Sequence, residues 1–234
     1  MTIAYQIKRS KRAVRARIVV TAEKVAVVAP VRMHEQKIAQ FVKSKQDWIT
    51  DAMLKLQSRL HANIRIAPET YIDGALIPYQ GRHYPLQIQS SQLRRIKVEF
   101  DQIHFRVFVP NLCDDQESIK LALTAWFKAR GKMLVNQHVS FHAPRYQLMP
   151  RSCRLKTQKS RWGSCGANND ININWLLTLA PPEILEYVVV HELCHIQVRN
   201  LSKDFWDLVG QHLPNFHEHR QWLTVNGASL MRGL

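Results

Sequence analysis

The sequence predicts an α+β protein, because its apolar residues alternate as in strands along some segments and recur with helical spacing along others. Alternation bounded by turn residues indicates short strands within 1–31 and 71–109. Apolar stripes with helical spacing predict a helix over 34–60 and a longer one over 117–142. The first of these stripes contains Trp48, which we therefore expect to be buried.

The rest of the chain is predicted to be two strands followed by helices. The strand candidates Arg151–Thr157 and Ile171–Leu177 flank a polar turn. Proline is tolerated in the first turn of a helix, so a helix is expected from Pro181-Pro182 to about Val198. Ser202 is a suitable cap for the next helix, and a last short helix is expected at about 215–224.

Two regions are expected from this order of elements. Residues 1–112 form a β-rich region with one long helix, and residues 113–234 form a second region. The length of 234 residues suits one domain with a small appendage. Hydrophobic residues make up 46% of the chain, which is enough for a sizeable core and argues against extensive disorder.

The chain is strongly basic, with 33 Lys and Arg against 18 Asp and Glu, a net charge of +15. Such a surface attracts polyanions such as nucleic acid or acidic protein segments. The alternative is a solvated basic surface without a specific partner. The basic residues include an N-terminal set without any acid and a later run: Lys8, Arg9, Lys11, Arg12, Arg15, Arg17, then Arg151, Arg154, Lys156, Lys159, Arg161.

The sequence gives no signal for secretion or for a membrane span. The N-terminus has no apolar stretch long enough for a signal peptide, and no window supplies the ~20 apolar residues that a span requires. The four cysteines, Cys113, Cys153, Cys165 and Cys194, form no C-x-x-C pair. We therefore expect reduced thiols in a cytoplasmic protein.

The strongest chemical signal is His191-Glu192-Leu193-Cys194-His195 on the predicted helix. Two His four residues apart rise ~6 Å along a helix and lie within about 40° of each other around its axis. Their imidazoles can converge on one zinc ion, and the adjacent carboxylate of Glu192 can take a proton from a metal-bound water. This H-E-x-x-H pattern is typical of metal-assisted peptide hydrolysis. The alternative is a buried helix with two hydrogen-bonded histidines.

Two further features are weaker. His138 and His142 are also four residues apart, but no acid lies between them, and we interpret them as a structural helix face. The segment 161–164 can form an edge strand or a turn over the expected zinc-binding cleft, where backbone groups would bind an extended peptide by strand addition.

Five motifs together resemble the YgjP-like metallopeptidase family, a family of metal-dependent hydrolases, and more distantly the SprT-like proteases. They are Arg161-Trp162-Gly163-Ser164-Cys165, Ile171-Asn172-Ile173-Asn174-Trp175, Leu179-Ala180-Pro181-Pro182, Tyr187-Val188-Val189-Val190-His191-Glu192-Leu193-Cys194-His195 and Ser202-Lys203-Asp204-Phe205-Trp206. The likeness covers most of the chain. It implies a zincin-like C-terminal catalytic region, with Zn²⁺ held by three His and Glu192 as general base.

The sequence departs from that family at the third ligand. The family has Asn-His-Ser after the H-E-x-x-H helix, whereas this chain has Asn200-Leu201-Ser202. Leucine cannot bind a metal, and a catalytic zinc normally has three protein ligands. Another residue can substitute, with His212 as the first candidate and Asp204 behind it. Alternatively, two His and water hold the ion, or the chain has kept the fold and lost catalysis.

The sequence thus predicts a zinc metallopeptidase that hydrolyses a peptide or protein substrate, with His191 and His195 as ligands and Glu192 as base. The alternative function is a catalytically lapsed zincin-fold protein that binds nucleic acid or an acidic protein partner through its basic surface. A combination of both activities is also open.

Overall fold

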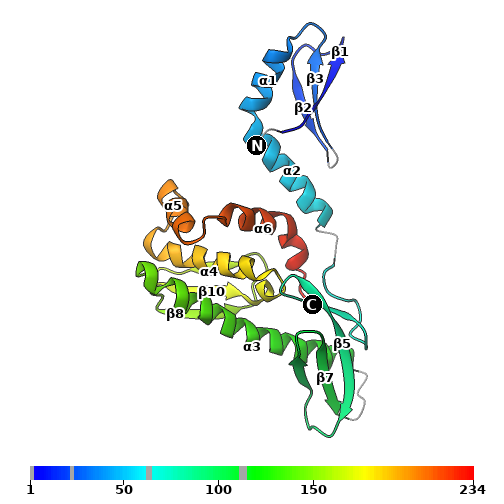
Figure 1. The fold of residues 1–234 in the computed structure, drawn as a ribbon, viewed down its shortest axis with the longest axis vertical. Helices are drawn as coiled ribbons and strands as arrows, with labels where there is room; N and C mark the ends of the chain where they lie inside the picture. Colours follow the sequence, from blue (N-terminus) through cyan, green and yellow to red (C-terminus); the bar gives the residue numbers. More distant parts are fainter. Residues whose placement is uncertain (1–2, 22–23, 62–64, 111–114) are drawn as a thin grey trace. The chain divides into compact units, whose positions relative to one another are not determined.

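The computed structural model describes residues 3–21, 24–61, 65–110 and 115–234. It confirms the mixed α+β class (Figure 1). Within these ranges, no helix combines the length and the apolar character that crossing a membrane requires.

The chain divides into two compact units. The first comprises Met1–Asn63 with Thr224–Ala228, and the second comprises Ile64–Leu223 with Ser229–Leu234. The division therefore lies near residue 64, whereas the sequence predicted it at 112. The reason is that buried side chains of the strands after residue 71, including Tyr79 and Phe105, share one hydrophobic core with the C-terminal helices.

The N-terminal unit has one three-stranded sheet and two helices. The strands β1 (Gln6–Ser10), β2 (Arg17–Val20) and β3 (Val25–Pro30) occur in the order β1-β3-β2, with β1 parallel and β2 antiparallel to β3. The helices are α1 (Glu35–Ser44) and α2 (Gln46–His61). Buried Val27, Ile38 and Ile49 join the sheet and both helices in a separate small core.

Two expectations for the helical segment of this unit are wrong. The predicted single helix at 34–60 is broken at Lys45, whose φ of −115° and ψ of 12° are not helical. Trp48 is 53% exposed rather than buried, because it lies about 100° around the helix axis from Ile49, which occupies the core. Continuous apolar spacing alone gave no sign of this break.

The C-terminal unit begins with a four-stranded sheet in the order β4-β5-β7-β6. Its strands are β4 (Leu76–Tyr79), β5 (Arg82–Ser91), β6 (Lys97–Phe100) and β7 (Phe105–Pro110). Strands β5 and β7 are parallel, and the other two pairs are antiparallel. Tyr79, Phe105 and Phe127 pack as one aromatic cluster that joins this sheet to α3 (Gln116–His142).

The remainder of this unit carries the candidate site. A second sheet has the order β8-β10-β9, with strands β8 (Ser152–Lys156), β9 (Gly163–Cys165) and β10 (Asp170–Asn174). The short helices η1 (Pro144–Tyr146) and η2 (Trp175–Thr178) precede α4 (Pro182–Gln197), α5 (Lys203–His212) and α6 (Phe216–Leu230). The residues Thr224–Ala228 of α6 are assigned to the first unit. Helices α3 and α4 pack on each other, with α3 against β8 and α4 against β9 and β10 (Figure 1).

Candidate active site

Helix α4 carries all three residues of the H-E-x-x-H motif. It begins at Pro182 with Pro181 as its N-cap, and its apolar side chains from Ile184 to Val190 anchor it in the core. The ring centroids of His191 and His195 lie 4.9 Å apart, with an angle of 86° between the rings. The helix therefore brings the two imidazoles side by side, as their spacing of four residues predicts.

The end of α4 orients His195. Its Nδ1 lies 3.0 Å from the backbone oxygen of Val198, the C-cap residue of the helix. A carbonyl can only accept a hydrogen bond, so Nδ1 carries the proton and Nε2 is left with a lone pair. The ring also stacks on buried Phe205 from α5, at 4.4 Å between centroids. A hydrogen bond of this kind to one ring nitrogen is the usual way to orient a metal-binding histidine.

His191 lies in an apolar setting formed by aromatic rings. Phe205 lies 4.9 Å from it, Tyr187 5.9 Å and Trp206 5.7 Å between centroids. Its Nδ1 is buried and has no hydrogen-bond partner. Burial, aided by the neighbouring His195, lowers the pKa of His191 to about 4. The ring is therefore neutral at pH 7, which is the form that binds metal.

Glu192 is buried against the edge strand β9. Glu192 is 5% exposed, and burial raises the pKa of its carboxyl group to about 7. A Cβ placed on Gly163 would lie 2.5 Å from Oε1 of Glu192, closer than any real contact of this type. Only a glycine in β9 therefore leaves room for this carboxyl group.

The loops around β9 are fastened by two side chains that the sequence analysis did not assign a role. Buried Asn174 donates through Nδ2 to the backbone oxygens of Gln158 and Arg161. Arg199, just after α4, donates to the backbone oxygens of Gly166 and Ala167 in the turn after β9. These contacts join segments 13 to 33 residues apart, so no local pattern could reveal them.

The candidate third ligands lie elsewhere or are exposed. His212 ends α5 with its Nδ1 3.3 Å from Nδ1 of His142, and Asp204 is exposed in the first turn of α5. Leu201, at the position of the family's third histidine, is 59% exposed. Within the described ranges, no third His, Cys, Asp or Glu joins His191 and His195 in a group of ligand atoms all within 4.8 Å of one another.

Such a group does exist at His138, His142 and Glu186, where it can hold a metal ion. His142, which the sequence analysis assigned to a structural face, is 2% exposed and lies 2.8 Å from the Glu186 carboxylate. Glu186 belongs to α4, so the acid that was missing between the two histidines comes from another helix. Burial lowers the pKa of His138. Burial also lowers the pKa of His212, to about 4.

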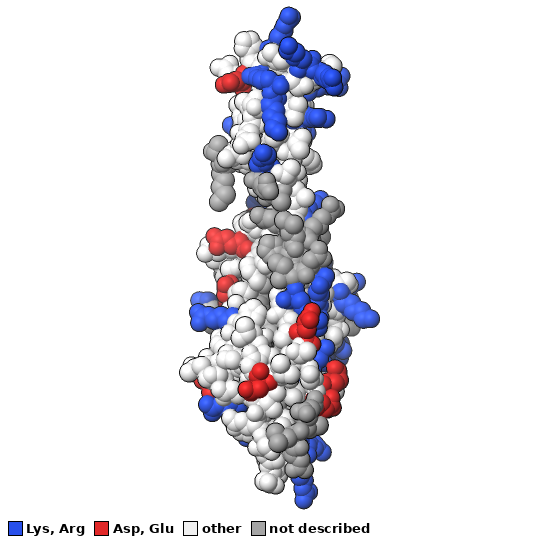
Figure 2. Space-filling view, turned by 90° about the vertical axis from the view of Figure 1, so that its right-hand side faces the viewer, with Lys and Arg blue, Asp and Glu red and all other residues white. Residues whose placement is uncertain are grey.

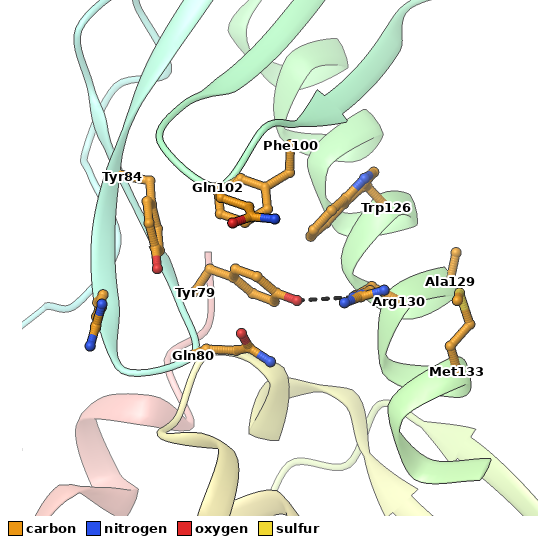
Figure 3. Close-up of a pocket in the computed structure, with 10 residues that line it drawn as sticks. Tyr79, Gln80, Tyr84, Phe100, Gln102, Trp126, Ala129, Arg130 and Met133 are labelled. Atoms are coloured by element: carbon orange, nitrogen blue, oxygen red, sulfur yellow. Dashed lines mark hydrogen bonds between the residues drawn. The ribbon is translucent and has the colours of Figure 1, made fainter. Parts of the chain in front are cut away.

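A cavity of about 630 Å³ contains none of these metal-binding candidates. In Figure 3, the ring of Tyr79 lies near Phe100 and Trp126, and its hydroxyl accepts a hydrogen bond from Nε of Arg130 at 3.1 Å. Gln80 lies on the other side of the ring (Figure 3). The cavity is thus an aromatic pocket between the four-stranded sheet and α3, and its residues include no convergent acid–base pair.

The chain thus combines a mixed α+β fold with an H-E-x-x-H motif on α4. The chain matches the family described as YgjP-like, metallopeptidase domain, over residues 14–226. Because the match spans most of the chain, the protein belongs to the YgjP-like metallopeptidase family, as the sequence motifs indicated. A search among curated proteins finds no match.

Proposed function

We propose that this protein is a zinc-dependent peptidase that hydrolyses peptide bonds of peptide or protein substrates, with His191 and His195 as metal ligands and Glu192 as general base. The observation that carries the proposal is that the His191 and His195 rings lie side by side on α4, with Nδ1 of His195 engaged by a backbone oxygen and the buried carboxyl group of the adjacent Glu192 against a strand edge. The family membership supports the same reaction class.

The two rings fit a metal ion by their protonation and setting. Nε2 of His195 has a lone pair because Nδ1 is engaged by Val198, and the His191 ring is neutral with an unpartnered buried Nδ1. When bound, a zinc ion supplies a Lewis acid that lowers the pKa of its water to roughly 7 and polarises the substrate carbonyl. With Leu201 in place of a histidine, we propose that water completes the coordination of the ion.

Glu192 takes the role of proton carrier. Its buried carboxyl group has a pKa of about 7, close to the operating pH at which a general base works best. Its oxygen would accept a proton from the attacking water and then donate it to the nitrogen of the departing amine. Gly163 leaves the space that this carboxyl group needs beside the edge strand.

Strand β9 is the proposed substrate-binding edge. In the described sheet it pairs with β10 on one side, where Gly163 lies opposite Ile173, and it is the last strand on the other side. An extended peptide can pair with the backbone of such an edge, which would hold the scissile bond next to Glu192. A requirement for an extended backbone rather than for particular side chains follows from this arrangement.

The test compares zinc content and hydrolysis of an unfolded protein substrate across three variants. Glu192→Gln should keep zinc and lose activity by at least about 10³-fold, and His191→Ala should lose both the activity and the zinc bound at the motif. Glu183→Gln, on the exposed first turn of the same helix, is the matched control and should behave as the wild type. Equal hydrolysis by wild type and Glu192→Gln would refute the proposal.

A second candidate function is the binding of a polyanion, either alone or to bring a substrate to the site. A cavity of about 600 Å³ supports this candidate. Its lining includes Trp175 and four basic side chains: Lys128, Lys132, Arg154, Lys156. The basic N-terminal residues are also exposed, and Figure 2 shows Lys and Arg gathered on the N-terminal unit in that view. Basic side chains gathered around a cavity suit the phosphate groups of a nucleic acid.

Binding of a labelled single-stranded DNA at low and high salt tests this candidate. The Lys132→Gln/Lys156→Gln variant should bind at least about tenfold more weakly at low salt, with a shallower salt dependence. Lys97→Gln, an exposed lysine that is not among the residues lining this cavity, is the control. Unchanged affinity in the double variant would exclude the cavity as the binding site.

Free Cys153, Cys165 and Cys194 accord with the cytoplasmic setting that we propose.

A further inference from the structure

Three side chains from two helices form a cluster apart from the H-E-x-x-H motif. His138 and His142 lie one turn apart near the end of α3, and Glu186 lies in α4. Oε1 of Glu186 lies 2.8 Å from Nε2 of His142 and 4.0 Å from Nδ1 of His138. The three side chains therefore direct one donor atom each toward a common point.

The spacing of these donors suits a small divalent ion. Tetrahedral zinc at ~2.0–2.1 Å from each ligand places its ligand atoms roughly 3.3 Å apart. The observed separations of 2.8 and 4.0 Å lie on either side of that value, so shifts of less than about 1 Å would complete the site. Two imidazoles and one carboxylate are also a ligand set typical of zinc.

His212 supports the cluster from α5. Its Nδ1 lies 3.3 Å from Nδ1 of His142. If Nε2 of His142 gives its lone pair to a metal, Nδ1 of that ring must carry the proton, and His212 is in place to accept it. A buried His142 with both ring nitrogens engaged in this way has a fixed tautomer and orientation, as metal-binding histidines usually do.

The cluster is separate from the candidate active site. Around the axis of α4, Glu186 lies about 140° from His191 and about 180° from His195. An ion bound by Glu186 is therefore on the opposite side of the helix from an ion bound by the motif. A cavity of about 410 Å³ that includes His142, His212 and exposed Arg145 gives access from solvent.

We propose that His138, His142 and Glu186 form a second, structural site for a divalent transition-metal ion, with His212 as the hydrogen-bonded support of His142. The ion would join α3 to α4 and would stabilise α4 on the face opposite the H-E-x-x-H motif. The competing interpretation is a metal-free hydrogen bond between His142 and Glu186, in which Nε2 of His142 carries the proton. This proposal does not depend on the peptidase activity.

Zinc titration of the full-length, chelator-treated protein tests the site. In a His191→Ala/His195→Ala background, we expect about one zinc per chain to remain. Adding Glu186→Gln, which keeps the size of the side chain, should weaken that binding by at least 100-fold, and so should adding His138→Ala. Adding His212→Ala should weaken it by 10- to 100-fold, the usual effect of removing a support of a ligand.

The control is His217→Ala, which removes an exposed histidine of α6 and should leave the titration unchanged. Circular dichroism verifies that each variant is folded, and Glu186→Gln keeps the test decisive if a histidine variant is not. In the otherwise wild-type protein, Glu186→Gln should remove one zinc whether or not the motif binds another. No zinc bound in the motif-free background, or equal affinity with and without Glu186→Gln, would overturn the proposal.

Discussion

Gly163 of β9 lies so close to Glu192 of α4 that a Cβ on the glycine would be 2.6 Å from Cγ and 2.8 Å from the carboxyl carbon of the glutamate. A strand of three residues and the middle of a helix thus share one confined space. The position of the proposed base therefore depends on a residue that has no side chain.

Gly163→Ala should displace the Glu192 carboxyl group, because its methyl group would overlap Cγ, the carboxyl carbon and Oε1 of that side chain. We expect a loss of peptidase activity of about 10²-fold, with zinc content unchanged. Gly166→Ala is the control, since a Cβ there meets only the backbone oxygen of Asp170 at an ordinary 3.6 Å. Full activity of Gly163→Ala would contradict the proposed role of Glu192.

Leu201→His restores the histidine that the family has at this position. If the backbone there keeps the family geometry, the new ring should tighten zinc binding at the motif by at least about tenfold. Because Leu201 is 59% exposed, Leu201→Ala should leave both stability and zinc affinity close to wild type. Zinc titrations in the Glu186→Gln background measure binding at the H-E-x-x-H motif alone. Identical zinc affinity of Leu201→His and Leu201→Ala would show that the loop at residue 201 does not reach the ion.

Asn174→Ala should destabilise the C-terminal unit. Its side chain is fully buried and donates to two backbone oxygens, and its Oδ1 accepts the backbone N–H of Leu176. Leaving these groups without partners should cost about 3 kcal/mol in the free energy of unfolding. Urea denaturation measures the loss. Asn172→Ala, which removes only a 3.3 Å contact with Ser164, should cost less than about 1 kcal/mol.

Asp170 should contribute a pH-dependent part of the stability. Its pKa lies below the usual 3.8, because the carboxylate accepts hydrogen bonds from Arg151 and Ser152. A depressed pKa in the folded state gives a stabilisation that is complete above the unfolded pKa and is lost as the pH falls through the folded pKa. Measured by urea denaturation at pH 6, the free energy of unfolding of the wild type should exceed that of Asp170→Asn. This difference in free energy should shrink below pH 3.8. A constant difference across that range would exclude the carboxylate as its source.

The parts of the site that lie within one helix could be predicted from the sequence, and the parts built from several elements could not. The spacing of His191 and His195 fixes their shared face of α4, and the structure has their rings 4.9 Å apart. The cluster around His138 depends on Glu186, 44 residues beyond His142, so it has no local signature. The position of His212 could not be predicted from local sequence either. Its place in the sequence suggested the third ligand of the motif, but its ring lies beside His142.

The fold shows the same limit. Alternation and helical spacing predicted the mixed α+β class and most elements, because each element buries its own apolar face. The break at Lys45 and the exposure of Trp48 depend on how α1 and α2 pack on their sheet, which periodicity does not record. The division near residue 64 likewise reflects a core shared by distant segments.

Anomalous diffraction at the zinc edge from crystals of the zinc-loaded protein tests whether the H-E-x-x-H motif binds zinc, because it locates the ion and its ligands together. We expect a peak bound by the imidazoles of His191 and His195, with the carboxyl group of Glu192 next to a water on the ion. Crystals with zinc at full occupancy elsewhere and no peak between these two rings would contradict it.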